Sequence, residues 1–185
     1  MAIKTLADTI GGEFKRVQFT PDLVPADLVG TRIYNQKTGE FGTSLGPVFT
    51  NLLLADEINR APAKVQSALL EVMQERQVTI GPETHPVPKP FLVMATQNPI
   101  ESEGTYPLPE AQVDRFMMKV VVGYPSAEEE ALVVERSLRP PAPISRILTA
   151  TDLETLQAMT AEVYVDRPIV DYAVYLATAT RAPER

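Results

Sequence analysis

The chain has 185 residues, 44% of them hydrophobic, and its 24 acidic against 17 basic residues give a formal net charge of −7 at pH 7. The absence of cysteine excludes disulfides and thiolate metal sites, and the single histidine, His85, excludes a multi-histidine zinc site. No apolar run approaches the roughly 18 residues that span a bilayer. Because neutralising DNA phosphates requires clustered Lys and Arg, the acidic balance argues against nucleic acid as a partner, and we expect a cytoplasmic globular protein without membrane insertion.

The N-terminal part of the sequence predicts short elements separated by turns. Apolar residues at helical spacing predict a helix over 2–10 that ends at Gly11. Residues 14–19 then predict a short strand. The stretch 21–47 is rich in Pro and Gly and predicts a loop with a small hairpin that turns at 35–39.

The central part has the alternating pattern of an α/β layer. The apolar run 51–55 predicts a strand buried on both faces of a parallel sheet. Residues 61–76 predict a helix, because their apolar side chains recur at helical spacing. A Gly-Pro pair between two strand-like runs predicts a hairpin over 77–87, and residues 91–96 predict a second buried strand.

The remaining sequence predicts a short helix over 109–116, a third buried strand over 117–122 and a helix over 126–138 opened by a capping box. A Pro-rich segment follows, which neither a helix nor a central strand tolerates. We therefore expect an α/β fold of the nucleotide-binding type with a helical appendage. Its expected parts are a core over 1–138, a linker over 139–146 and a helical domain over 147–185.

Two carboxylates, Asp56 and Glu57, directly follow the predicted strand 51–55. In α/β proteins ligands bind at the carboxyl edge of the sheet. There Asp56 could hold Mg²⁺, usually through water, and Glu57 could orient and deprotonate a water that attacks a γ-phosphate. The alternative is a strand that simply ends in a charged turn.

Two further polar residues are candidates for phosphate chemistry. Asn98 lies just beyond the predicted strand 91–96 and could donate a hydrogen bond to a γ-phosphate or to the attacking water, although Asn-Pro is also a turn signal. Arg115 lies at the end of a predicted helix and could reach an anion on a neighbouring subunit. Its alternative role is a surface ion pair with Asp114, which would contribute little.

Several motifs follow one another almost without interruption over roughly residues 14–125. They are QFTPDL at 18–23, GPVF at 46–49, LLLADEINRAP at 52–62, QSALLE at 66–71, MQERQV at 73–78, ATQNP at 95–99, EGTYPLPEAQ at 103–112 and DRF at 114–116. In this order they resemble the AAA+ ATPases and, more closely, the MoxR family among them.

This resemblance implies roles for the candidate residues. Asp56 and Glu57 would be the Walker B pair, with Asp56 for Mg²⁺ and Glu57 for the hydrolytic water. Asn98 would be the sensor 1 residue, and Arg115 the arginine finger that acts on ATP bound to the adjacent subunit. The implied cofactors are ATP and Mg²⁺.

The resemblance also implies an architecture and partners. It implies a partial AAA+ core, with a mostly parallel sheet flanked by helices, followed by the beginning of an α-helical lid. MoxR-like proteins are thought to form homo-oligomeric rings, expected here to be hexameric, and to act as chaperones that mature client proteins. Their common partner is a von Willebrand factor A domain protein.

The chain departs from the family in one motif. None of its nine glycines is followed by Lys, so it contains no phosphate loop of the type G-x-x-x-x-G-K-[ST]. We therefore expect the chain to be an excerpt of a longer ATPase. By the same comparison with the family, we expect this excerpt to lack the sensor 2 end of the lid as well. The alternatives are a non-hydrolysing pseudo-ATPase interaction module and, less compatible with the acidic charge, a nucleic-acid motor.

Overall fold

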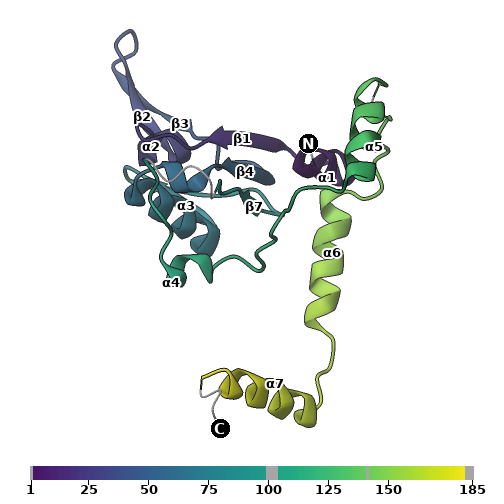
Figure 1. Cartoon of the computed structure of the whole chain (residues 1–185). Coiled ribbons are helices and arrows are strands. Elements are labelled where there is room, and N and C mark those ends of the chain that lie inside the picture. The colour runs from purple at the N-terminus through teal and green to yellow at the C-terminus, as the bar shows by residue number, and fades with distance from the viewer. Residues whose placement is uncertain (1, 99–103, 141, 182–185) are drawn as a thin grey trace. The chain divides into compact units, whose positions relative to one another are not determined.

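The structure is a computed structural model that describes residues 2–98, 104–140 and 142–181. The chain divides into two compact units, residues 1–150 and residues 151–185 (Figure 1). The division falls a few residues after the predicted linker 139–146, and the assignment of domains stays a prediction. Among the described helices, none combines the length and the apolarity needed to cross a bilayer.

A parallel sheet lies at the centre of the first unit. Within the described residues it has three strands in the order β1-β4-β7, with β1 at Phe14–Gln18, β4 at Leu52–Asp56 and β7 at Leu92–Ala95 (Figure 1). The helix α1, Ala2–Ile10, precedes β1 and ends where Gly11 adopts a positive φ of 62°. The predicted α/β class, the first helix and these parallel strands are therefore confirmed.

The helix α3, Ala63–Glu75, shares a core with one face of this sheet. Its Val65 and Leu69 pack in one cluster with Leu53 and Ala55 of β4 and with Val93 of β7, and each of these side chains is at most 9% exposed. Alternation along a strand places Leu53, Ala55 and Val93 on the same face, while helical spacing brings Val65 and Leu69 together. Burying an aliphatic side chain of this kind contributes about 1.5–3 kcal/mol.

The opposite face of β7 differs from the prediction. Leu92 and Met94 are 42% and 38% exposed, so the expectation of a strand buried on both faces is wrong for this strand. The physical reason is that, in the part of the chain described, no helix covers this face of β7. On β4 the corresponding Leu52 is buried, and α1 contacts that strand.

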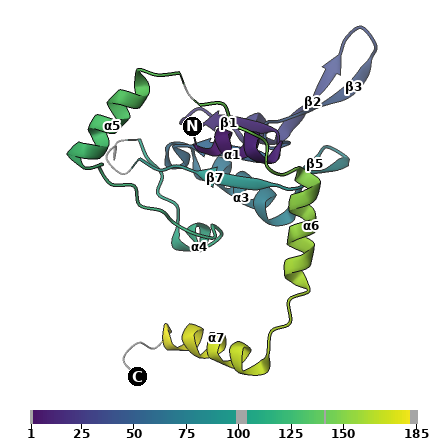
Figure 2. The same cartoon turned by 90° about the vertical axis from the view of Figure 1, so that its right-hand side faces the viewer.

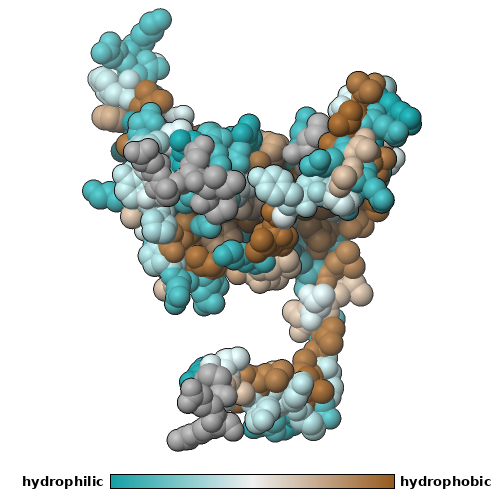
Figure 3. Space-filling view, viewed as in Figure 1, coloured by the Kyte–Doolittle hydropathy of each residue, from teal (hydrophilic) through white to brown (hydrophobic). Residues whose placement is uncertain are grey.

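Two hairpins flank the sheet and helix. The predicted hairpin within 21–47 is formed by β2, Gly30–Asn35, and β3, Glu40–Leu45, and the second by β5, Gln77–Ile80, and β6, Glu83–Pro86. The β2–β3 hairpin projects from the sheet in both views, and its outer end is hydrophilic (Figures 1–3). The short helix α2, Pro25–Val29, lies in a stretch predicted to be loop.

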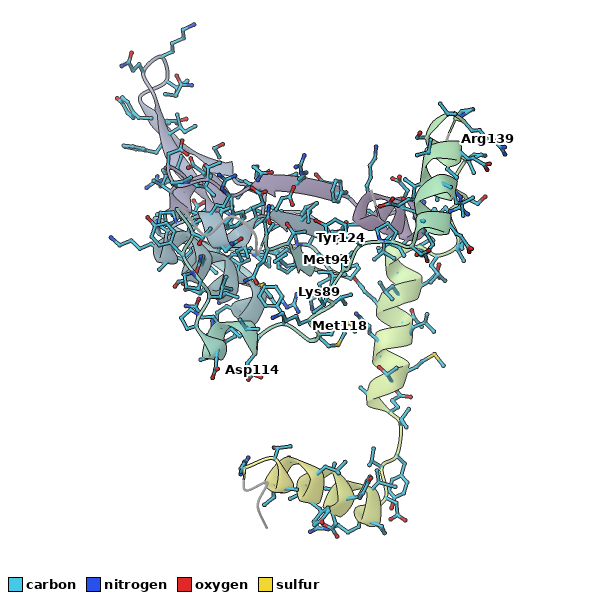
Figure 4. The ribbon with its side chains drawn as sticks, in the orientation of Figure 1. Lys89, Met94, Asp114, Met118, Tyr124 and Arg139 are labelled. Carbon is cyan, nitrogen blue, oxygen red and sulfur yellow. The ribbon has the colours of Figure 1, made fainter. Side chains whose placement is uncertain are left out.

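The segment after α4, Glu110–Val113, is not the strand that its composition predicts. Residues 117–122 belong to no helix or strand, and Met117, Val121 and Val122 are each more than 80% exposed. Met118 of this segment and Tyr124 just beyond it are labelled in Figure 4. Strand formation requires a neighbour that exchanges backbone hydrogen bonds, and no described strand lies beside this segment.

The remaining regular elements of the described residues are helices. The predicted capping box is confirmed: α5, Ala127–Ser137, begins where Ser126 Oγ accepts from the Glu129 amide at 3.3 Å and Glu129 Oε2 accepts from the Ser126 amide at 2.8 Å. The helix α6 spans Ala150–Ala161, and α7 spans Arg167–Ala179 in the second unit.

Candidate active site

The strand β4 ends in Asp56, and Glu57 turns the chain into the short 3₁₀ helix η1, Ile58–Arg60. Glu57 has φ 55° and ψ 49°, the left-handed region that costs a non-glycine residue about 1–3 kcal/mol. Such a conformation persists only where surrounding interactions hold it, and it is typical of functional sites.

Thr96, the first residue after β7, contacts both acidic residues. Its hydroxyl donates to Asp56 Oδ1 at 2.5 Å and accepts from the Glu57 amide at 2.8 Å. Its backbone oxygen accepts from the Ile58 amide at 3.0 Å. The ends of β4 and β7 are therefore joined at the carboxyl edge of the sheet.

Asn98 lies at the same edge. Its backbone oxygen accepts from Asn59 Nδ2 at 3.3 Å, which ties the chain beyond β7 to η1. The structure thus places Asn98 at the sheet edge that carries Asp56 and Glu57, as expected for the ends of neighbouring parallel strands.

Side chains of β1 and η1 complete the surroundings of the two carboxylates. Arg16 donates to Asp56 Oδ2 through Nε at 2.9 Å and through Nη2 at 2.5 Å. Glu57 Oε2 accepts from Gln18 Nε2 at 2.7 Å and from Arg60 Nη1 at 3.1 Å. These partners could not be predicted from the sequence because they depend on which strand lies beside β4. The strand register, with Gln18 opposite Asp56, supplies that information.

These contacts shift the acidity of Asp56. The hydrogen bond from the Thr96 hydroxyl is the main cause that holds the pKa of Asp56 below its ordinary value of 3.8, and the Arg16 guanidinium lowers it further, against the opposing effect of burial. Asp56 is therefore ionised at neutral pH. A carboxylate held in this form is the form that binds a divalent cation.

The lowered pKa predicts a pH dependence of stability. Because the folded-state pKa lies below the unfolded value of 3.8, the ionised Asp56 stabilises the fold above pH 3.8, and this stabilisation is lost as the pH falls through the folded pKa. Between about pH 6 and about pH 3 we expect the free energy of unfolding of the wild type to fall more than that of Asp56→Asn. Urea denaturation at both pH values measures this decrease in the free energy of unfolding. Asp114→Asn, at an exposed position, is the control. Equal decreases in the wild type and in Asp56→Asn would contradict the prediction.

Arg115 is separate from this cluster. It follows α4 and is exposed, and the side chain of its neighbour Asp114 points away from the sheet (Figure 4). Among the described residues, no hydrogen bond or ion pair joins Arg115 to Asp56, to Glu57 or to Asp114. The expectation that Arg115 acts on an adjacent subunit stays a prediction.

The donor set at the strand ends is compatible with Mg²⁺. Asp56 offers a carboxylate with the Thr96 hydroxyl beside it, and Mg²⁺ prefers oxygen ligands. No group of three or more His, Asp or Glu that could hold a metal occurs among the described residues. In proteins Mg²⁺ commonly keeps several water ligands and binds through one or two carboxylates together with substrate phosphates.

A buried amide supports the loops around the site. Gln66 of α3 is 1% exposed, and its Nε2 donates to the backbone oxygens of Ile58, Ala61 and Tyr106 at 3.2, 3.1 and 2.9 Å. It therefore ties the turn after Glu57 to the segment after Asn98. In the sequence Gln66 is recognisable only as part of a motif, because an amide on a helix carries no signal of its buried partners.

Removal of this amide is expected to destabilise the fold. In Gln66→Ala the backbone oxygens of Ile58, Ala61 and Tyr106 lose this donor, so we expect the free energy of unfolding to fall by about 1–3 kcal/mol. Urea denaturation measures the loss. Gln74→Ala, at an exposed position of the same helix, is the matched control and is expected to change stability by less than about 0.5 kcal/mol. Equal effects of the two substitutions would show that the Gln66 contacts contribute nothing.

Comparison with known proteins identifies the family. The pattern of the ATPase family associated with various cellular activities (AAA) matches residues 1–118. The chain is 60% identical to Chaperone MoxR1 from Mycobacterium tuberculosis, in a match that covers the whole of this chain and 49% of that protein. It is 48% identical to YeaC from Bacillus subtilis, in a match that covers 98% of this chain and 57% of that protein. A crystal structure of a protein assigned as an ATPase, from Cytophaga hutchinsonii, superposes with a TM-score of 0.88 at 51% identity, covering 99% of this chain and 56% of that one.

The chain thus spans about half the length of the curated relatives it matches. Both the matched pattern and the strand-end acidic pair lie within residues 1–118. On these grounds the chain belongs to the MoxR family of AAA+ ATPases.

Proposed function

We propose that Asp56, Glu57 and Asn98 form part of the ATP-hydrolysing site of a ring-forming MoxR-type AAA+ ATPase. The observation that supports this most strongly is the pair of consecutive carboxylates at the carboxyl edge of a parallel sheet, bonded through Thr96 to the strand that leads to Asn98. Ligands of open α/β sheets bind at this edge.

The residues divide the chemistry between them. Asp56, kept ionised by Thr96 and Arg16, holds water ligands of Mg²⁺, and Mg²⁺ when bound supplies positive charge to the phosphate oxygens. Glu57 orients the attacking water and accepts its proton. The Asn98 amide donates a hydrogen bond to the γ-phosphate or to that water, whatever the protonation state of its neighbours.

The assembled protein is proposed to be a homo-oligomeric, hexameric ring in the cytoplasm. In a ring, Arg115 of one subunit supplies charge to ATP bound by the next, which is compatible with its exposed position outside the carboxylate cluster. The relative in Mycobacterium tuberculosis is named a chaperone. We infer a chaperone-like role in maturing client proteins, with a von Willebrand factor A domain protein as partner.

Phosphate release tests this function. The full-length protein that carries this chain is incubated with ATP and Mg²⁺, and we expect release of phosphate that stops when the metal is chelated. A protein that assembles or binds partners but releases no phosphate would contradict the proposal and support the alternative, a non-hydrolysing interaction module.

A further inference from the structure

We propose that Thr96 is a positioning residue that holds Asp56 and Glu57 in the geometry needed for ATP hydrolysis. The inference rests on the proposed function of these two carboxylates. It assigns a role to the hydroxyl of a residue that lies one position beyond β7 and two positions before Asn98.

The contacts of Thr96 reach three consecutive residues of the other strand end. The hydroxyl bonds to the Asp56 carboxylate at 2.5 Å and to the Glu57 amide at 2.8 Å, and the backbone oxygen accepts from the Ile58 amide at 3.0 Å. A single hydroxyl thus fixes the direction of one carboxylate and the backbone that carries the other.

Glu57 needs such a partner. Its left-handed backbone is unfavourable for a residue with a Cβ, and its amide donates to the Thr96 hydroxyl. Loss of that acceptor would release the amide and let the backbone relax toward an ordinary conformation, which turns the Glu57 side chain away from its present direction. The Thr96 hydroxyl therefore acts on catalysis through Glu57 and Asp56.

The position allows the hydroxyl to be tested alone. The Thr96 side chain is exposed, so its replacement creates no cavity in the core. Thr96→Val keeps the branched shape and removes the hydroxyl, while Thr96→Ser keeps the hydroxyl and removes the methyl group. Thr79→Val is the matched control, because Thr79 is an exposed threonine whose hydroxyl lies 3.0 Å from that of Thr84 in the β5–β6 hairpin.

Two readouts on the full-length protein test the proposal. The first is amide hydrogen exchange at Glu57, resolved to single residues by mass spectrometry. In Thr96→Val we expect faster exchange by about three- to tenfold, the factor that corresponds to one lost net hydrogen bond, and in Thr96→Ser exchange close to the wild type. The second is steady-state ATP hydrolysis, where Thr96→Val is expected to lower kcat by about tenfold or more with little change in KM, and Thr96→Ser to retain most of the activity.

The two readouts separate this inference from the proposed function. Unchanged Glu57 exchange in Thr96→Val, or a Thr96→Ser variant as impaired as Thr96→Val, would overturn the role of the hydroxyl. A Thr79→Val variant as slow as Thr96→Val would overturn it as well. If the wild type releases no phosphate, the proposed function is contradicted, and so is the proposed effect of Thr96 on hydrolysis. The exchange measurement would still show whether the Thr96 hydroxyl holds the Glu57 amide.

Discussion

Replacement of Glu57 by glutamine is expected to abolish ATP hydrolysis while ATP binding is retained. Glutamine has nearly the shape of glutamate and can still accept a hydrogen bond from water, but it cannot accept the proton of the attacking water. General-base catalysis typically contributes 10²–10⁴-fold, so kcat is expected to fall by about that factor. Phosphate release measures the rate, and calorimetric titration with ATP measures the binding.

The control is Glu71→Gln, the same substitution at an exposed position of α3. It changes the net charge by the same amount and is expected to leave the rate within about twofold of the wild type. Undiminished hydrolysis in Glu57→Gln would reject Glu57 as the base. Loss of ATP binding in this variant would instead indicate that Glu57 contributes to nucleotide affinity.

Arg115→Ala is expected to abolish hydrolysis in homogeneous rings and to be rescued by a second inactive variant. An arginine that acts on the transition state from a neighbouring subunit is worth about 10³–10⁵ in kcat. When Arg115→Ala and Glu57→Gln subunits are mixed, some interfaces combine an intact Glu57 with an intact Arg115. These interfaces are expected to hydrolyse ATP, so the mixture should release phosphate although neither variant does so alone.

Arg139→Ala is the matched control for Arg115→Ala. Arg139 is an exposed arginine that follows α5 (Figure 4), and its removal is expected to leave hydrolysis unchanged. If the mixture of Arg115→Ala and Glu57→Gln stays inactive although mixed rings form, action of Arg115 across a subunit interface is excluded.

The parts of the fold that sequence patterns predict are those in which local pattern and tertiary burial agree. The apolar run that becomes β4 is followed by two consecutive carboxylates. Its apolar character therefore predicts its burial, and the carboxylates predict its end at Asp56. Residues 117–122 have the same apolar character, but a strand also requires a neighbour, and no local pattern reports whether one is present. The helix α2 was missed for the opposite reason. Its composition favours a loop, whereas burial of Leu28 stabilises five residues of helix.

The sequence predicts the two carboxylates of the candidate site, but it does not predict the side chains that form hydrogen bonds with them. Asp56 ends β4, Glu57 follows it, and Asn98 lies shortly beyond β7, so the parallel arrangement alone brings them to one edge. The bond between Thr96 and Asp56 joins residues 40 positions apart, and the pairs of Arg16 with Asp56 and of Gln18 with Glu57 depend on the order of β1 and β4. Strand order and register are set by tertiary packing, which a single sequence does not report.

A crystal structure of the full-length Glu57→Gln protein with Mg²⁺ and ATP tests the nucleotide site most directly. We expect the Asp56 carboxylate to contact Mg²⁺ through an ordered water and the Asn98 side-chain amide to lie about 3 Å from a γ-phosphate oxygen or from the attacking water. A nucleotide bound elsewhere on the protein, with Asp56 still paired to Arg16 and Asn98 remote from every phosphate, would contradict the assignment of this sheet edge as the site of hydrolysis.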